Sequence, residues 1–168
     1  MRSPATFVLV AIAIGIGAWN NSAADASSSK RALSFPTRTF LRKCDKFILL
    51  SLDPSFDDET SKSEQFHRYH VLGKTEINDT KRKWELITAL ITGVERARDR
   101  NFIALCFNPR HAIQAVAGTN SVDLLICFEC GKIVEFTTAD QYFCKMDDDA
   151  KEVFNRTLTE AGVPLAKK

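Results

Sequence analysis

The chain has 168 residues, and its 23 basic and 21 acidic residues leave a formal net charge of +2. This near balance argues against nucleic acid as the main partner, because nucleic-acid binding usually shows as a strong basic excess. The length suits one domain with a hydrophobic core of its own.

The N-terminus has the pattern of a secretory signal peptide. Arg2 is followed by an uncharged run from Phe7 to Trp19, and Ala24-Asp25-Ala26 fits the small-x-small rule for cleavage before Ser27. The run of 13 residues is shorter than the about 20 that a membrane span needs. We therefore expect residues 1–26 to be removed and the mature chain to be periplasmic or extracellular, with no stable membrane span. An uncleaved anchor or a buried first helix is the alternative.

After this segment, residues 27–38 are rich in serine, which predicts a flexible lead-in to a single domain over residues 39–168. Lys46 to Leu52 is apolar on both alternating faces, as in a strand buried on two sides. Phe66 to Ile77 predicts a second strand. Apolar residues then recur at spacings of three and four, so a helix is expected from Thr80 to about Arg98 with Asp79 or Thr80 as its cap.

The second half of the chain reads as strands followed by a helix. Strands are expected over residues 102–107, 112–116, 122–129 and 132–136, the middle two as a hairpin. An apolar face from Ala150 to Ala161 predicts a C-terminal helix that stops at Gly162. Short links between strands favour an antiparallel sheet. The predicted fold is α+β: a single small domain with an antiparallel β-sheet and two main helices packed on one of its faces.

The chain contains five cysteines, at positions 44, 106, 127, 130 and 144. In an oxidising compartment cysteines tend to pair, but an odd number cannot pair fully within one chain. One candidate disulfide links Cys106 to Cys127 or Cys130 on neighbouring strands. Cys44 and Cys144 are candidates for a second disulfide, which would close a long loop.

Three of the cysteines also form a candidate metal site with a histidine. Cys106, His111, Cys127 and Cys130 have ligand types that suit tetrahedral zinc, although their spacing is not that of a standard zinc finger. Residues three apart on a strand face opposite sides, so Cys127 and Cys130 converge only if the chain bends near Gly131. Disulfide, metal, redox and free-thiol roles all remain open for this set.

Arg110 and His111 are the candidate catalytic residues, because they follow a proline-containing break where side chains can point into a cleft. The arginine can bind a carboxylate or phosphate, and the histidine can act as an acid, a base or a ligand. The structural alternative is that Arg110 pairs with Asp123 or Glu129 while His111 caps a turn. No nucleophile in a recognisable motif accompanies the pair.

Four segments together resemble a family of uncharacterised bacterial exported proteins: SLDP at 51–54, LCFNPRH at 105–111, DLLICFEC at 123–130 and AGVPLA at 161–166. That family shares CFxPRH and DLxICFEC segments. The resemblance implies a bacterial, extracytoplasmic small domain without an established activity. The family has glycine after the Arg-His pair, where this chain has Ala112.

Two functional hypotheses follow. The first is a small exported, non-enzymatic binding or structural module that is stapled by disulfides and binds a protein or a small ligand. The alternative is a zinc- or thiol-dependent site built from Cys106, His111, Cys127 and Cys130. The modest size, balanced charge and lack of an assembled catalytic motif favour the first.

Overall fold

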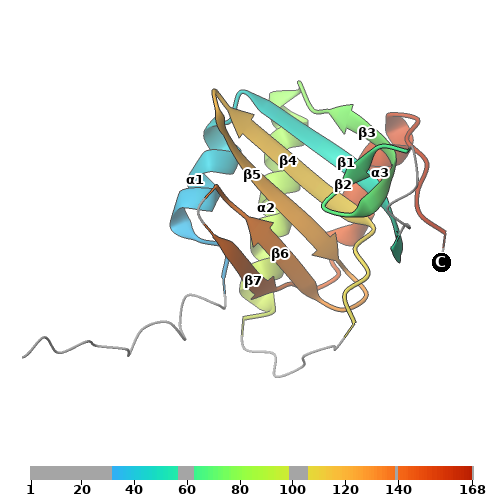
Figure 1. Ribbon diagram of the computed structural model, residues 1–168. Helices are drawn as coiled ribbons and strands as arrows, with labels where there is room; N and C mark the ends of the chain where they lie inside the picture. The colour runs from blue at the N-terminus through green and yellow to red at the C-terminus, as the bar shows by residue number, and fades with distance from the viewer. Residues whose placement is uncertain (1–31, 57–62, 99–105, 139, 168) are drawn as a thin grey trace, which may run out of the picture.

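The computed structural model describes residues 32–56, 63–98, 106–138 and 140–167. Within them, seven strands form one antiparallel sheet in the order β2-β3-β1-β4-β5-β6-β7 (Figure 1). The strands are β1 (Lys46–Phe56), β2 (Gln65–Phe66), β3 (Tyr69–Glu76), β4 (His111–Ala117), β5 (Asn120–Cys127), β6 (Lys132–Phe136) and β7 (Gln141–Lys145). The helices are α1 (Phe35–Lys43), α2 (Thr80–Arg96) and α3 (Lys151–Glu160). The expected signal peptide lies outside the described residues.

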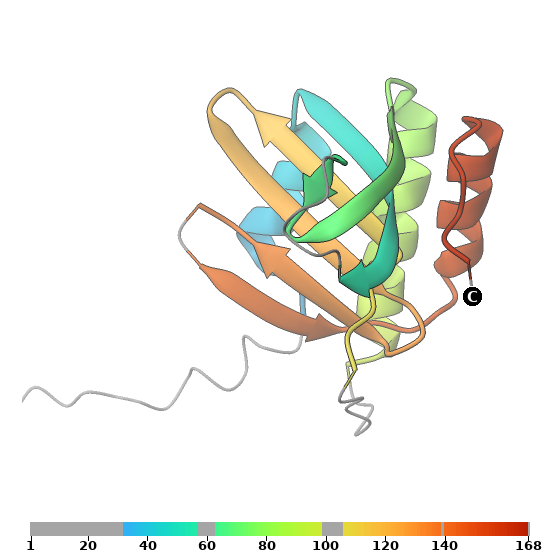
Figure 2. The same cartoon turned by 45° about the vertical axis from the view of Figure 1, so that its right-hand side comes forward.

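The sheet curves into a half-barrel, and irregularities in β1 contribute to the curve. The pairing of β1 with β3 shifts register between Ser51 and Leu52 and again between Leu52 and Phe56. Such bulges bend a strand and increase its twist. Figure 2 shows the strands turning away from one plane, with β6 and β7 at one side and β2 and β3 at the other.

The main core lies between the sheet and the helices. Alternate residues of β1, such as Phe47 and Leu49, point into it, together with Leu86 and Leu90 of α2 and Phe154 of α3. These side chains are at most 1% exposed. Because successive strand residues point to opposite faces, the other residues of β1 belong to a second cluster.

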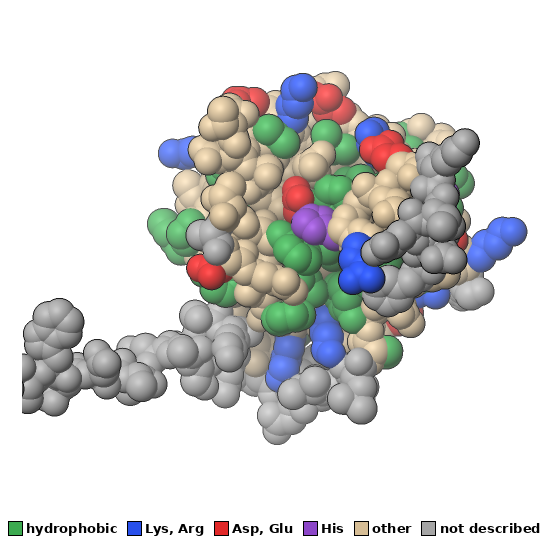
Figure 3. Space-filling view, in the orientation of Figure 1, with side chains coloured by type: hydrophobic (Ala, Val, Ile, Leu, Met, Phe, Trp, Pro, Cys, Tyr) green, Lys and Arg blue, Asp and Glu red, His purple; other side chains and the backbone are tan. Residues whose placement is uncertain are grey.

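The second cluster covers the opposite face of the sheet, which is turned toward the viewer in Figure 3. It contains Leu50, Leu52, Phe66, Tyr69, Ala112, Leu125 and Val134. Figure 3 also shows a histidine and an acidic side chain side by side among apolar side chains on this face. This face, which none of the described helices covers, is thus partly apolar and partly polar.

Local sequence explains where α1 and α2 begin. Ser34 caps α1, and its Oγ accepts a hydrogen bond from the backbone N–H of Thr37 at 3.2 Å. Asp79 caps α2 by accepting from the N–H groups of Lys81 and Arg82, and these hydrogen bonds hold the pKa of its carboxyl below the ordinary value. The predicted cap and extent of α2 are confirmed.

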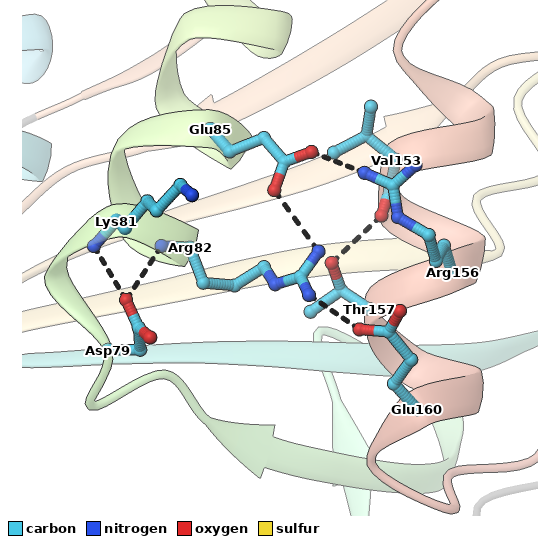
Figure 4. Close-up of polar contacts among 8 residues, drawn as sticks. All are labelled: Asp79, Lys81, Arg82, Glu85, Val153, Arg156, Thr157 and Glu160. Carbon is cyan, nitrogen blue, oxygen red and sulfur yellow. Dashed lines mark hydrogen bonds and ion pairs between the residues drawn. The ribbon is translucent and has the colours of Figure 1, made fainter.

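A network of ion pairs joins α2 to α3 (Figure 4). The guanidinium of Arg82 contacts Glu85 at 3.1 Å and Glu160 of α3 at 2.6 Å, and Arg156 of α3 pairs with Glu85. These side chains are between 29% and 52% exposed. Partly exposed pairs of this kind contribute about 0–1 kcal/mol each. The network therefore orients α3 more than it stabilises the domain.

The predicted architecture of two main helices packed on one face of the sheet is wrong. The structure is a seven-stranded antiparallel half-barrel with three short helices, although the mixed α+β character holds. The additional helix, α1, overlaps residues 35–38 of the expected flexible lead-in, and it buries only Thr37 and Leu41. So few buried positions leave no clear helical periodicity in the sequence.

The strand predictions have mixed outcomes. The strand starting at Lys46, the hairpin of β4 and β5, and β6 over residues 132–136 are confirmed. The expected strand from Phe66 to Ile77 is a hairpin of β2 and β3 instead, and β7 was not predicted. The expected strand over 102–107 lies mostly outside the described residues. No helix among the described residues is long and apolar enough to cross a membrane.

Candidate functional site

Arg110 lies beside the loop that follows β5, and it is held there by an ion pair. Its Nη1 lies 3.1 Å from Oε2 of Glu129, while Nζ of Lys151 at the start of α3 lies 2.9 Å from Oε1 of the same carboxylate. Burial opposes the charge of Glu129, but the hydrogen bond from Lys151 and the two cations hold its pKa below the ordinary value. The expected pairing of Arg110 with Glu129 is confirmed, so the arginine connects β4 with this loop and α3.

His111 is the first residue of β4 and is only 3% exposed. Its Nε2 lies 2.7 Å from Oδ1 of Asn155, and its ring packs edge-on against Phe128 and Phe154. Burial lowers the pKa of His111 from 6.5 to about 4, although the hydrogen bond with Asn155 and the charge of Glu129 act the other way. The imidazole is therefore neutral near pH 7, and its position within aromatic side chains makes it part of the core.

The structure links Cys127 to Cys130, with their Cα atoms 5.5 Å apart. The chain bends after β5 in the way that this pairing requires: Gly131 has φ +59°, and its N–H donates to the carbonyl of Phe128 at 3.2 Å. A Cβ at Gly131 would lie 2.9 Å from the carbonyl oxygen of Met146, so glycine is required for space as well as for conformation.

The other cysteines are free: Cys106 is exposed, whereas Cys44 and Cys144 are buried. The expected disulfide between Cys44 and Cys144 is not formed, and Cys106 does not pair with Cys127 or Cys130. Within the described part of the chain, no three or more His, Cys, Asp or Glu residues form a group that could hold a metal ion. The proposed zinc ligands are thus not brought together, because two of them form the disulfide.

A histidine outside the predicted sites spans the open face of the sheet. His67, in the turn between β2 and β3, places Nε2 2.8 Å from Oδ2 of Asp123 on β5, and its ring stacks on Phe136 of β6 at 4.0 Å. Both contacts lie several strands away in the sheet order. His67 therefore joins the two sides of the half-barrel across its open face.

The turn that carries His67 has an unusual backbone. His67 and the following Arg68 have φ angles of +49° and +74°. A two-residue hairpin loop with two positive φ angles fits a type I′ turn, which normally favours Asn-Gly. Side chains other than glycine in this region cost about 1 kcal/mol or more each. The contacts of His67 with Asp123 and Phe136 offset part of this cost.

A neutral cavity lies between the start of α1 and one end of the sheet, near the turns that join β4 to β5 and β6 to β7. We call it the hydroxyl cavity, and its volume is about 420 Å³. Its polar lining consists of Ser34, Thr37, Asn120, Ser121, Thr137 and Thr138. Its apolar and aromatic lining consists of Pro36, Phe40, Val122 and Tyr142.

A buried carboxylate orders one wall of the hydroxyl cavity. Glu135 of β6 is 2% exposed, and its Oε1 accepts hydrogen bonds from the hydroxyls of Thr37 and, at 3.2 Å, Ser34. Both donors belong to the first turn of α1 or its cap, where a negative charge is favourable. Glu135 thus holds the start of α1 against the sheet and fixes the two hydroxyls.

A second, apolar cavity of about 360 Å³ lies next to the hydroxyl cavity along the same helix. This apolar cavity is lined by Phe35, Pro36, Thr39, Phe40, Lys43, Cys44 and Ala117. It shares Pro36 and Phe40 with the hydroxyl cavity, so the two are neighbours around α1. Phe35 is 81% exposed, the largest value among the large hydrophobic side chains of the described residues.

A larger and more open recess of about 680 Å³ follows α3. Its lining is mainly charged, and several of those charges are already in ion pairs: Asp149, Lys151, Arg156 and Glu160. A ligand there would have to displace existing partners. A ligand in the hydroxyl cavity would not have to break any of these ion pairs.

Sequence reasoning missed the hydroxyl cavity because its lining comes from α1, from the ends of β5 and β7 and from the turn between β6 and β7, and these residues form no motif. The available signal was the capping pattern at Ser34 with Pro36 close behind, which is typical of a helix start. Ser121 of β5 and the turn residues Thr137 and Thr138 carried no signal of their own.

Comparison of the chain with protein-family models, with curated proteins and with solved structures found no match. The resemblance of the four sequence segments to a family of exported proteins therefore stays a prediction.

Proposed function

We propose that the protein is an exported, non-enzymatic binding module and that the hydroxyl cavity is its binding site. The observation that carries this proposal is the role of the two candidate catalytic residues. Arg110 is held in an ion pair with Glu129, and His111 is a buried, neutral imidazole packed between two phenylalanines. Neither is poised for proton transfer, because a general base requires access to substrate and a pKa near the working pH.

The surroundings of the hydroxyl cavity suit binding rather than reaction. Its volume falls within the about 300–1,000 Å³ of typical ligand pockets, and it combines aromatic and aliphatic walls with a few polar groups. The side chains of Asn120, Ser121 and Thr138 make no hydrogen bond within the described residues, so they are available to a ligand. The disulfide supports the export part of the proposal, because disulfides persist mainly in oxidising compartments.

The proposal is tested by titrating the isotopically labelled protein with four classes of small molecules: neutral saccharides, carboxylates, amines and aromatic compounds. We expect at least one class to shift the backbone amide signals of Ser121 and Tyr142 in a saturable way, while the signal of Asn155 on α3 stays unchanged. Shifts confined to Arg110 and His111, or turnover of any compound that depends on these two residues, would contradict the proposal.

A matched pair of variants separates binding in the cavity from general surface effects. Ser121→Phe places a ring in the hydroxyl cavity at a strand position that tolerates aromatic residues. Thr159→Phe adds the same ring on the exposed surface of α3. We expect only Ser121→Phe to abolish the shifts. Equal binding by both variants would refute the location.

A further inference from the structure

The two cavities around α1 differ in chemistry and share a wall. Among the described residues, no charged side chain lines the hydroxyl cavity, whereas the apolar cavity is lined mostly by carbon and contains one charged residue, Lys43. Pro36 and Phe40 belong to both. One ligand that reaches from the first cavity to the second must therefore have a polar, uncharged end and an apolar end.

The polar end is constrained by the hydrogen-bonding groups. Hydroxyl and amide side chains both donate and accept, and such groups pair with hydroxyls of the same dual character. A phosphate or carboxylate would lose its water shell, and the described lining residues include no cation to compensate. Strong anion sites normally use arginine, lysine or a cluster of backbone N–H groups. Tyr142, 38% exposed, and Phe40 add ring surface for the C–H groups of a sugar.

The positions of the hydroxyls are fixed before any ligand arrives. Ser34 and Thr37 are held by the buried carboxylate of Glu135, and Tyr142 donates its hydroxyl to Oδ2 of Asp140 at 3.0 Å. Glu135 does not itself line the cavity, so it is a positioning residue. A pre-ordered set of neutral polar groups lowers the entropy cost of binding a polyhydroxylated molecule.

The apolar cavity defines the other end. Phe35, Phe40 and Ala117 offer apolar surface, and Phe35 is left largely in water. Burying one methylene group against such surface is worth about a fourfold gain in affinity. A short alkyl group next to the polar end would therefore bind there.

We propose that the site around α1 binds glycosides, with the neutral saccharide in the hydroxyl cavity and a short apolar aglycone in the apolar cavity. This inference rests on the proposed function, which places ligand binding in the hydroxyl cavity, and it adds the class of ligand.

The test compares hexyl and methyl glycosides of glucose, galactose and mannose, with hexyl phosphate as the charged counterpart, by calorimetry and by amide shifts. We expect at least one hexyl glycoside to bind at least tenfold more tightly than its methyl glycoside, the gain from two buried methylene groups. Hexyl phosphate should bind at least tenfold more weakly than that hexyl glycoside. Equal affinity for hexyl phosphate would overturn the neutral head group.

Two variants and a control test which cavity binds each end of the ligand. Phe35→Ala removes an exposed ring and should reduce the advantage of the hexyl over the methyl glycoside at least threefold, with methyl glycoside affinity unchanged. Ser121→Phe should abolish binding of both glycosides, and Thr159→Phe should change neither. An unchanged hexyl advantage in Phe35→Ala would overturn the assignment of the apolar end.

The outcome also separates this inference from the proposed function. If no glycoside binds but another class of compound shifts Ser121 and Tyr142, the inference fails and the binding module stands. If no compound shifts these residues, both fail.

Discussion

The neutral state of His111 makes the stability of the protein depend on pH in a defined direction. The unfolded chain binds a proton on this imidazole with the ordinary pKa of 6.5, but burial lowers the pKa in the folded protein to about 4. Between these values the unfolded state binds more protons, so the free energy of unfolding falls as the pH falls. Across this pH range, His111 contributes about 3 kcal/mol to the free energy of unfolding, and about 2 kcal/mol of it is lost between pH 7 and 4.5.

Urea unfolding of the wild type and of His111→Gln at several pH values measures this effect. The glutamine amide does not titrate and can still hydrogen-bond to Asn155, so the variant should be less stable at neutral pH but lose about 2 kcal/mol less on acidification. Comparing the two proteins removes the contribution of the carboxylates they share. The C2 proton of His111 gives an independent NMR readout in the wild type. A titration midpoint near 6.5, or equal pH dependence in both proteins, would refute the burial argument.

Three further predictions concern other parts of the fold. Reducing the bond between Cys127 and Cys130 should lower the free energy of unfolding by about 2 kcal/mol, the loop entropy of so short a closed segment; an unchanged urea midpoint after reduction would contradict this. His67→Asn, which keeps a residue tolerant of positive φ but removes the stacked ring and its hydrogen bond with Asp123, should cost about 1–2 kcal/mol in the same assay. A variant as stable as the wild type would show that the bridge across the sheet contributes nothing. Iodoacetamide at about pH 8 should label exposed Cys106 in the native protein, whereas Cys144, whose thiol pKa burial raises to about 12, should react only after unfolding; native labelling of Cys144, read by peptide mass spectrometry, would contradict its burial.

The parts of the fold that could be predicted are those where a single local rule dominates. α2 has a capping aspartate and a continuous apolar stripe, and the hairpin of β4 and β5 has alternating apolar residues around a turn, so sequence and structure agree there. β7 reads QYFCK, and three of its five residues are exposed, so it lacks the apolar pattern of a buried strand. It is an edge strand, paired only with β6.

The curvature of the sheet and the two cavities depend on contacts between distant residues. His67 meets Asp123 across the curved sheet, and Ser34 meets Glu135 where α1 lies against the sheet. Neither contact can be predicted from the spacing of its two residues along the chain. The disulfide between Cys127 and Cys130 could be predicted only in part, because the glycine after the second cysteine permits the bend that the bond needs but does not require it.

The arginine and histidine that stood out in the sequence are distinctive for a structural reason. Arg110 holds the charged tip of the disulfide loop through Glu129, and His111 fills an aromatic space between that loop and α3. Each position needs a side chain of a particular shape and charge, which limits the residue types that it can hold. A binding surface made of small hydroxyl side chains places weaker demands on any single position, because serine and threonine offer similar groups. Chemically conspicuous residues can therefore mark the scaffold of such a domain, while the ligand site that we propose consists of residues that form no motif.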